Sequence, residues 1–191
     1  MNKAVIILVF VLFGAPVLIA TLLHSEWFDA RMGGTRNHGE FVQPVIPLPD
    51  GWQASRGDGS SLSRDDLLDR WQLVHRRQQP CDEACLEDLY WLRQVRRAQD
   101  RHQPDVGLLL VSLTPVDEQT RQQILTLADD FQILDGQAAA AVHEAFPSPP
   151  EAPSSYILDP MGNIILQYSA DADPNGIRRD LRRLLTWTQR N

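Results

Sequence analysis

The chain has 191 residues, of which 43% are hydrophobic, and carries a formal net charge of −7 at neutral pH. This length allows one compact domain with an additional segment, and the negative charge argues against nucleic acid as a partner. Two cysteines are too few for a disulfide scaffold, so a close pair indicates redox chemistry, metal binding or one local bridge.

The N-terminal segment is strongly apolar. Residues 4–23 contain no charged side chain and match the length of about 20 residues that a bilayer-spanning helix needs. Trp27 and Phe28 follow, at the level where aromatic rings settle in a membrane interface. A cleaved signal peptide would have a shorter apolar core and a small-residue cleavage site, and we find no convincing site after the run. We predict a single N-terminal transmembrane helix within 1–23, in contact with membrane lipid, and a linker over 24–36.

The compartment of the following domain is inferred from the layout of the chain. Too few charges flank the apolar run for the positive-inside rule to decide its orientation. A short tail, one span and a folded domain form the usual signal-anchor arrangement, and a vicinal cysteine pair suits an oxidising compartment. We therefore predict a single-pass protein of the bacterial inner membrane, with its domain over 37–191 in the periplasm.

The domain alternates between strand-like and helix-like segments. Prolines and apolar residues over 37–52 indicate an extended edge segment. Short apolar runs predict buried strands, and apolar residues at helical spacing predict amphipathic helices, one of which carries Arg93, Arg96 and Arg97 on a solvated face. The predicted strands are 71–75, 105–112 and 131–134, followed by a hairpin of 156–158 and 163–168. The predicted helices are 85–101, 114 or 117 to 128, 137–146 and 174 or 175 to 191.

This order defines the fold class that we predict. Strands that alternate with helices form a parallel sheet covered on both faces, and the final hairpin adds an antiparallel pair. The cysteine pair begins the first of these helices. An α/β domain with a thioredoxin-like layout fits the pattern.

Cys81 and Cys85 are the only cysteines, and they stand where the strand at 71–75 gives way to a helix. A thiolate at a helix N-terminus is stabilised by free N–H groups and the helix dipole, which lower its pKa. We expect an exposed Cys81 that attacks a substrate disulfide and a more buried Cys85 that resolves the intermediate. Asp82 and Glu83 oppose this, because nearby negative charge raises a thiol pKa. Two thiolates also suit Cu(I), and a static local disulfide is the alternative without chemistry.

Two segments carry a family resemblance. Pro153 to Ile164, Pro-Ser-Ser-Tyr-Ile-Leu-Asp-Pro-Met-Gly-Asn-Ile, resembles the P-T-T-F-L-I-D-x-x-G-x-I segment of membrane-anchored thioredoxin-like proteins. The resemblance implies that Pro153 is a cis proline that faces the cysteine pair. The Cys-x-x-x-Cys spacing resembles the Sco/SenC proteins instead, which are copper-binding assembly factors of cytochrome c oxidase. The stretch from Tyr156 to Gly162 is similar to the Sco Y-L-I-D-P-x-G strand.

The copper ligands implied by this resemblance are incomplete. Sco proteins bind copper through both cysteines and a histidine five residues before the hairpin tyrosine, where this chain has Glu151. His143 could replace it only if the intervening proline-rich loop folds back, and it is otherwise expected to be a surface histidine. Cys81 and Cys85 are thus candidate Cu(I) ligands without an assigned third ligand.

Three functions follow from these residues. The leading hypothesis is a Sco-like protein that serves cytochrome c oxidase biogenesis by thiol–disulfide exchange or copper handling. Its partner would be an oxidase subunit or another copper-site protein, and it would be a thiol–disulfide oxidoreductase. The second is a binding or scaffold module of oxidase assembly that has lost the chemistry. The third is a general disulfide reductase.

Overall fold

The structure is a computed structural model of the chain. It describes residues 3, 12–15, 37–56, 60–147 and 154–188. The chain divides into two compact units, Met1–Asn37 and His38–Asn191. Most of the predicted span at 4–23 lies outside the described residues, and among the residues described no helix is long and apolar enough to cross a membrane.

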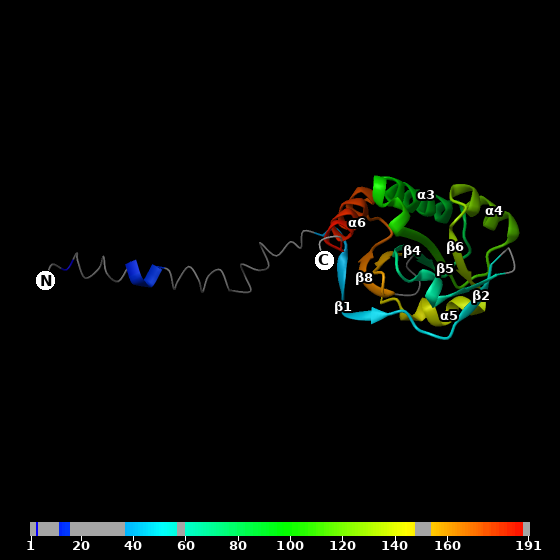
Figure 1. Ribbon diagram of the computed structural model, residues 1–191, viewed down its shortest axis with the longest axis horizontal. Helices are drawn as coiled ribbons and strands as arrows, with labels where there is room; N and C mark the ends of the chain where they lie inside the picture. Colours follow the sequence, from blue (N-terminus) through cyan, green and yellow to red (C-terminus); the bar gives the residue numbers. More distant parts are fainter. Residues whose placement is uncertain (1–2, 4–11, 16–36, 57–59, 148–153, 189–191) are drawn as a thin grey trace. The chain divides into compact units, whose positions relative to one another are not determined.

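Among the described residues, six strands of the second unit form one mixed sheet in the order β1-β8-β7-β4-β5-β6 (Figure 1). β4, β5 and β6 are parallel to one another, whereas β7, β8 and β1 join by antiparallel pairing. The predicted parallel core with an added antiparallel hairpin is therefore confirmed. The strands are β1 (Glu40–Pro47), β4 (Trp71–Arg77), β5 (Val106–Ser112), β6 (Gln132–Asp135), β7 (Ser154–Leu158) and β8 (Asn163–Tyr168).

Helices cover both faces of this sheet. The first face packs against α3 (Glu83–Arg97), α4 (Glu118–Leu127) and α6 (Pro174–Thr188), and the second against α5 (Gly136–Ala145) (Figure 1). We call the cores on these two faces the α3 core and the α5 core. A small hairpin, β2 (Gln53–Ser55) with β3 (Ser61–Ser63), was not predicted from the sequence, because its strands are only three residues long.

The alternation along β4 decides which side chains reach the cysteine helix. Leu73 packs in the α3 core and Val74 in the α5 core, because successive side chains of a strand point to opposite faces. His75 then faces α3, whereas Arg76 faces the other side, where its guanidinium donates to the Tyr156 hydroxyl at 3.4 Å. All seven residues of β4 are buried, as expected for a central strand with helices on both faces.

A buried carboxylate fixes the start of the domain against its last helix. Asp180 of α6 accepts hydrogen bonds from the backbone N–H groups of His38 at 2.7 Å and Gly39 at 2.9 Å, and from the Tyr168 hydroxyl at 3.1 Å. Burial, and then the Asp180 charge, raise the pKa of Tyr168 far above its usual range. A Cβ atom on Gly39 would lie 2.5 Å from the Tyr168 ring, so only glycine fits there.

Two boundaries of the cysteine helix differ from the prediction. α3 begins at Glu83, because Asp82 adopts an extended conformation and caps the helix. It ends at Arg97 rather than at residue 101, and a 3₁₀ segment, Asp100–Asp105, follows with Asp100 at a positive φ of 53°. A non-glycine residue in this conformation does not continue a right-handed helix.

Candidate functional site

Cys81 and Cys85 form a disulfide at the N-terminus of α3, with their Cα atoms 5.2 Å apart. Cys81 precedes the helix and is partly buried, whereas Cys85 lies in the first turn and is fully buried in the α3 core. Cys85 is the more buried of the two, as expected, whereas Cys81 is partly buried rather than exposed. An attacking sulfur must be reachable and a resolving sulfur need not be.

The segment between the two cysteines is held by Asp82 and Arg77. Asp82 Oδ1 accepts the Cys85 backbone N–H at 3.1 Å and lies 3.2 Å from Arg77 Nη1. The hydrogen bond from Cys85, followed by the charge of Arg77, lowers the pKa of the Asp82 carboxyl. Arg77 is 6% exposed, and its Nε also donates to the Gln79 carbonyl at 3.1 Å.

This pairing adds a group to the electrostatics expected from the sequence. Of the two acidic residues expected to oppose a thiolate, Asp82 forms a salt bridge with a buried guanidinium at the end of β4, and Glu83 is exposed. Positive charge near a thiol favours the thiolate. Sequence reasoning missed Arg77 because its side chain reaches the site only through the strand alternation that sends it toward α3.

A second polar pair lies beneath the helix one turn further on. His75 Nε2 is 3.6 Å from Asp88 Oδ2, and His75 is 2% exposed. Neither ring nitrogen of His75 has a hydrogen-bond partner among the described residues. Burial, with a smaller contribution from Arg77, lowers the pKa of His75 to about 3. Burial raises the pKa of Asp88 and outweighs the lowering by Arg77, while the charges of Glu87 and Asp82 add to the rise.

Pro153 and Glu151, which stands where the resemblance implies a copper-ligand histidine, lie outside the described residues. The cis proline therefore stays a prediction. The described chain resumes at Ser154, the first residue of β7, and Ser155 pairs with His75. This register brings the start of β7 beside the end of β4 that leads into the cysteines.

His143 is not the surface histidine that we expected. It lies on α5 and is 3% exposed, because this alanine-rich helix packs closely against the second face of the sheet. Burial, and then the charge of Arg76, lower the pKa of His143 to about 4. Its helix belongs to the α5 core, whereas Cys85 belongs to the α3 core. Within the part of the chain that the structure describes, no group of three His, Cys, Asp or Glu residues could hold a metal ion.

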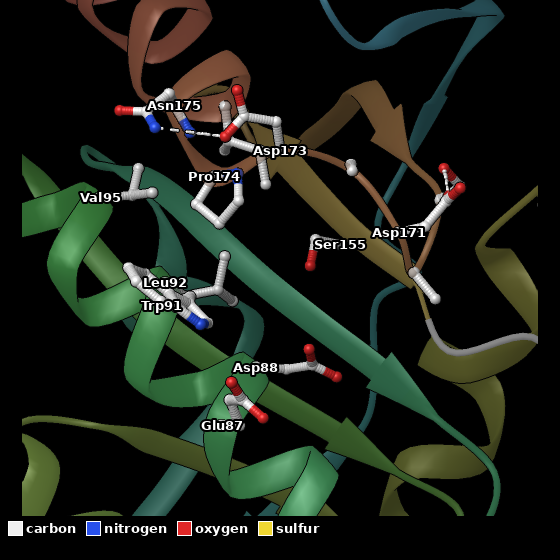
Figure 2. Close-up of a pocket in the computed structure, with 14 residues that line it drawn as sticks. Glu87, Asp88, Trp91, Leu92, Val95, Ser155, Asp171, Asp173, Pro174 and Asn175 are labelled. Carbon is white, nitrogen blue, oxygen red and sulfur yellow. Dashed lines mark hydrogen bonds between the residues drawn. The ribbon is translucent and has the colours of Figure 1, made fainter.

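An open groove of about 470 Å³ lies beside the disulfide helix (Figure 2). Glu87, Asp88 and Trp91 of α3 line one side, and the loop of residues 169–173 lines the other together with the first two residues of α6. Ser155 of β7 lies between the two sides. Because Asp88 also faces His75, the groove and the buried polar pair meet at the same carboxylate.

The comparisons with known proteins agree with this fold. A family model described as "Transmembrane-like, thioredoxin-like, C-terminal domain" matches residues 71–188. No curated protein sequence matches the chain.

Solved structures with a similar fold include Sco proteins. Apo Sco1 from Thermus thermophilus is 16% identical with a TM-score of 0.62, and the match covers 79% of this chain and 98% of that one. Copper-bound ScoI from Arabidopsis thaliana is 14% identical, with a TM-score of 0.60 over 73% and 99% of the two chains. BsSco, described as having a disulfide switch and as a member of the Sco family of cytochrome c oxidase assembly proteins, is 15% identical, with a TM-score of 0.55 over 75% and 96%. At these identities the likeness shows a thioredoxin-like fold.

Proposed function

We propose that this chain, which belongs to the transmembrane-like, thioredoxin-like, C-terminal domain family, performs thiol–disulfide exchange at Cys81 and Cys85. One observation carries the proposal: the disulfide lies at a helix N-terminus, with Cys81 partly exposed and Cys85 fully buried. We assign the exchange to cytochrome c oxidase biogenesis by analogy with a structural neighbour described as an oxidase assembly protein.

The exchange has two steps. The Cys81 thiolate of the reduced protein attacks one sulfur of a partner's disulfide, which forms a mixed disulfide and releases one partner thiolate. The Cys85 thiolate then attacks the Cys81 sulfur, which restores the Cys81–Cys85 disulfide and releases the second partner thiolate. Two electrons pass to the partner, which becomes a dithiol. A separate dithiol donor must reduce the protein before the next cycle.

The surrounding residues support each step. The N–H groups and dipole of α3, together with the Arg77 guanidinium, favour the thiolate of Cys81. Cys85 must lose its proton in the apolar core, and Asp88 lies one turn later on the same helix with a raised pKa. We assign Asp88 the role of proton acceptor for the Cys85 thiol, and we assign His75 the role of a positioning residue behind it.

The membrane location is part of the proposal. The apolar run at 4–23 would anchor the protein in a bacterial inner membrane, with the domain in the periplasm, where its copper-site partner would be reached. Protease added to spheroplasts tests this topology. Digestion of the domain in intact spheroplasts supports a periplasmic location, and protection until the membrane is lysed refutes it.

The exchange itself is tested by trapping thiols with an alkylating reagent in growing cells. We expect a mixture of dithiol and disulfide forms that shifts when the donor of reducing equivalents is removed, and a loss of oxidase assembly with Cys81→Ser. If the pair stays in one state and Cys81→Ser assembles the oxidase normally, a scaffold role replaces the proposal. Reduction of a generic protein disulfide at a comparable rate would favour a general reductase.

Copper handling is the second candidate, because the two cysteines lie one turn apart and both sulfurs are soft donors. The described residues supply this pair and no third ligand for it, so a complete site would need a donor from a partner or from outside the described residues. Cu(I) bound per reduced protein tests the idea. Stoichiometric copper that survives His143→Ala and is lost with Cys81→Ser supports copper handling, whereas no copper above background rejects it.

A further inference from the structure

The groove beside the disulfide helix has an acidic rim and an apolar floor (Figure 2). Four carboxylates line it, two on α3 and two on the loop before α6, and its lining contains no basic residue. The floor includes Leu92 and Ile177, which are buried side chains of the α3 core. The four carboxylates are Glu87, Asp88, Asp171 and Asp173.

Among the described residues, none of these carboxylates forms a salt bridge with an arginine or lysine, although the charge of Arg77 acts on Asp88. Asp171 accepts from the Ser169 hydroxyl at 2.6 Å, and Asp173 accepts from the Asn175 backbone N–H at 2.9 Å. Asp88 lies against His75, which is neutral at working pH because burial lowers its pKa. A cation that enters the groove would therefore meet negative charge that no arginine or lysine salt bridge neutralises.

An exposed aromatic side chain adds a second element of recognition. Trp91 lines the groove and is 44% exposed, and its neighbour Tyr90 is 41% exposed. The two rings lie edge to face, with their centroids 5.5 Å apart. An aromatic face beside carboxylates suits the aliphatic stem and charged head of lysine or arginine.

The position of the groove connects it with the disulfide. Asp88 is three residues after Cys85 on α3, and Ser155 in the groove pairs with His75 in the sheet. His75 is buried, lacks a hydrogen bond on either nitrogen among the described residues, and lies against the Asp88 carboxylate on the groove wall. The groove therefore begins at Glu87, two residues after Cys85 on the same helix.

We propose that this groove binds a lysine- or arginine-bearing extended segment of the protein whose disulfide Cys81 attacks. The inference rests on the proposed thiol–disulfide exchange and names its substrate class: disulfides flanked by basic residues. The apolar floor and Trp91 hold the stems of these residues, and the carboxylates on both sides hold their charges.

Binding is tested without any redox step. Two fluorescent ten-residue peptides differ only in four positions, which are lysine and arginine in one and glutamate in the other, and both carry serine in place of cysteine. Anisotropy titrations use the full oxidised chain in non-ionic detergent at low ionic strength. We expect the basic peptide to bind, the acidic peptide not to bind, and salt to weaken the binding.

The variants make the site specific. Asp171→Asn with Asp173→Asn keeps the hydrogen-bond acceptors and removes two charges, so we expect the affinity for the basic peptide to fall about fivefold. Glu118→Gln with Asp129→Asn removes the same charge from another part of the surface and should leave the affinity unchanged. Trp91→Leu should weaken binding by a similar factor without changing the charge.

The outcomes separate this inference from the proposed function. A cysteine version of each peptide, joined by a disulfide to a chromogenic thiol, reports exchange with the reduced protein. Equal exchange with both peptides, or equal binding of both, refutes the inference about the groove and leaves the proposed exchange in place. Selective binding of the basic peptide with no exchange supports the inference about the groove and refutes the proposed thiol–disulfide exchange. An equal loss of affinity in both paired variants also overturns the groove, because it would reflect net charge alone.

Discussion

The buried His75 gives a pH dependence that can be worked out from the structure. Burial lowers its pKa from 6.5 to about 3 in the folded protein, so the unfolded chain binds up to one more proton between these pH values. Stability contributed by this residue is therefore complete above pH 6.5 and is lost as the pH falls toward 3. At a slope of about 1.4 kcal/mol per pH unit, the 1.5 units between 6.5 and pH 5 cost about 2 kcal/mol. This cost depends little on the folded pKa, since pH 5 lies well above it.

The assay is urea unfolding of the oxidised unit His38–Asn191 at about pH 8 and about pH 5, with circular dichroism as the signal that reports unfolding. His75→Leu removes the titrating ring, so we expect this variant to lose about 2 kcal/mol less than the wild type between the two conditions. Because its pKa is raised, Asp88 increases the free energy of unfolding as the pH falls, but this contribution is present in both proteins. His143→Leu, on the α5 face of the sheet, should likewise lose less stability than the wild type between the two pH values. Equal losses in wild type and His75→Leu would refute the reasoning.

Three further substitutions test the site and its support. Arg77→Gln should raise the pKa of the Cys81 thiol in the reduced protein and slow its alkylation at neutral pH about three- to tenfold; an unchanged pH profile of alkylation contradicts this. Asp82→Ala removes the cap of α3 and should lower the free energy of unfolding by about 1 kcal/mol, with a smaller loss for Asp82→Asn; equal losses for the two variants would remove the capping argument. Asp180→Ala leaves two backbone N–H groups and the Tyr168 hydroxyl without their acceptor and should cost about 3 kcal/mol in urea unfolding; a loss below about 1 kcal/mol would mean that water replaces the carboxylate.

The fold could be predicted where a local pattern decides the structure. All seven residues of β5 are buried, as the unbroken apolar run at 105–112 predicts for a central strand. Asp117 caps α4 through the Thr120 backbone N–H, as its position before a helical pattern indicates. The end of α3 could not be predicted, because no residue spacing encodes the positive φ of Asp100.

The positions of the two cysteines could be predicted from the sequence, but the polar residues around them could not. The cysteines were identified from their spacing at a strand–helix junction, whereas Arg77 and His75 act through contacts that depend on the direction of β4 side chains. Arg96 shows the same limit. It was expected on a solvated face but is 6% exposed and makes two hydrogen bonds to Asp130, which lies 34 residues away. Contacts between distant segments are not visible in local periodicity.

The central claim is that Cys81 attacks and Cys85 resolves, and a trapping experiment tests it most directly. Cells that express Cys85→Ser, Cys81→Ser or the double variant are treated with an alkylating reagent, and membranes are separated under non-reducing conditions. We predict a disulfide-linked complex with Cys85→Ser that disappears on reduction and is absent from the other two. A complex that forms with Cys81→Ser instead, or no complex with any variant, would contradict the account.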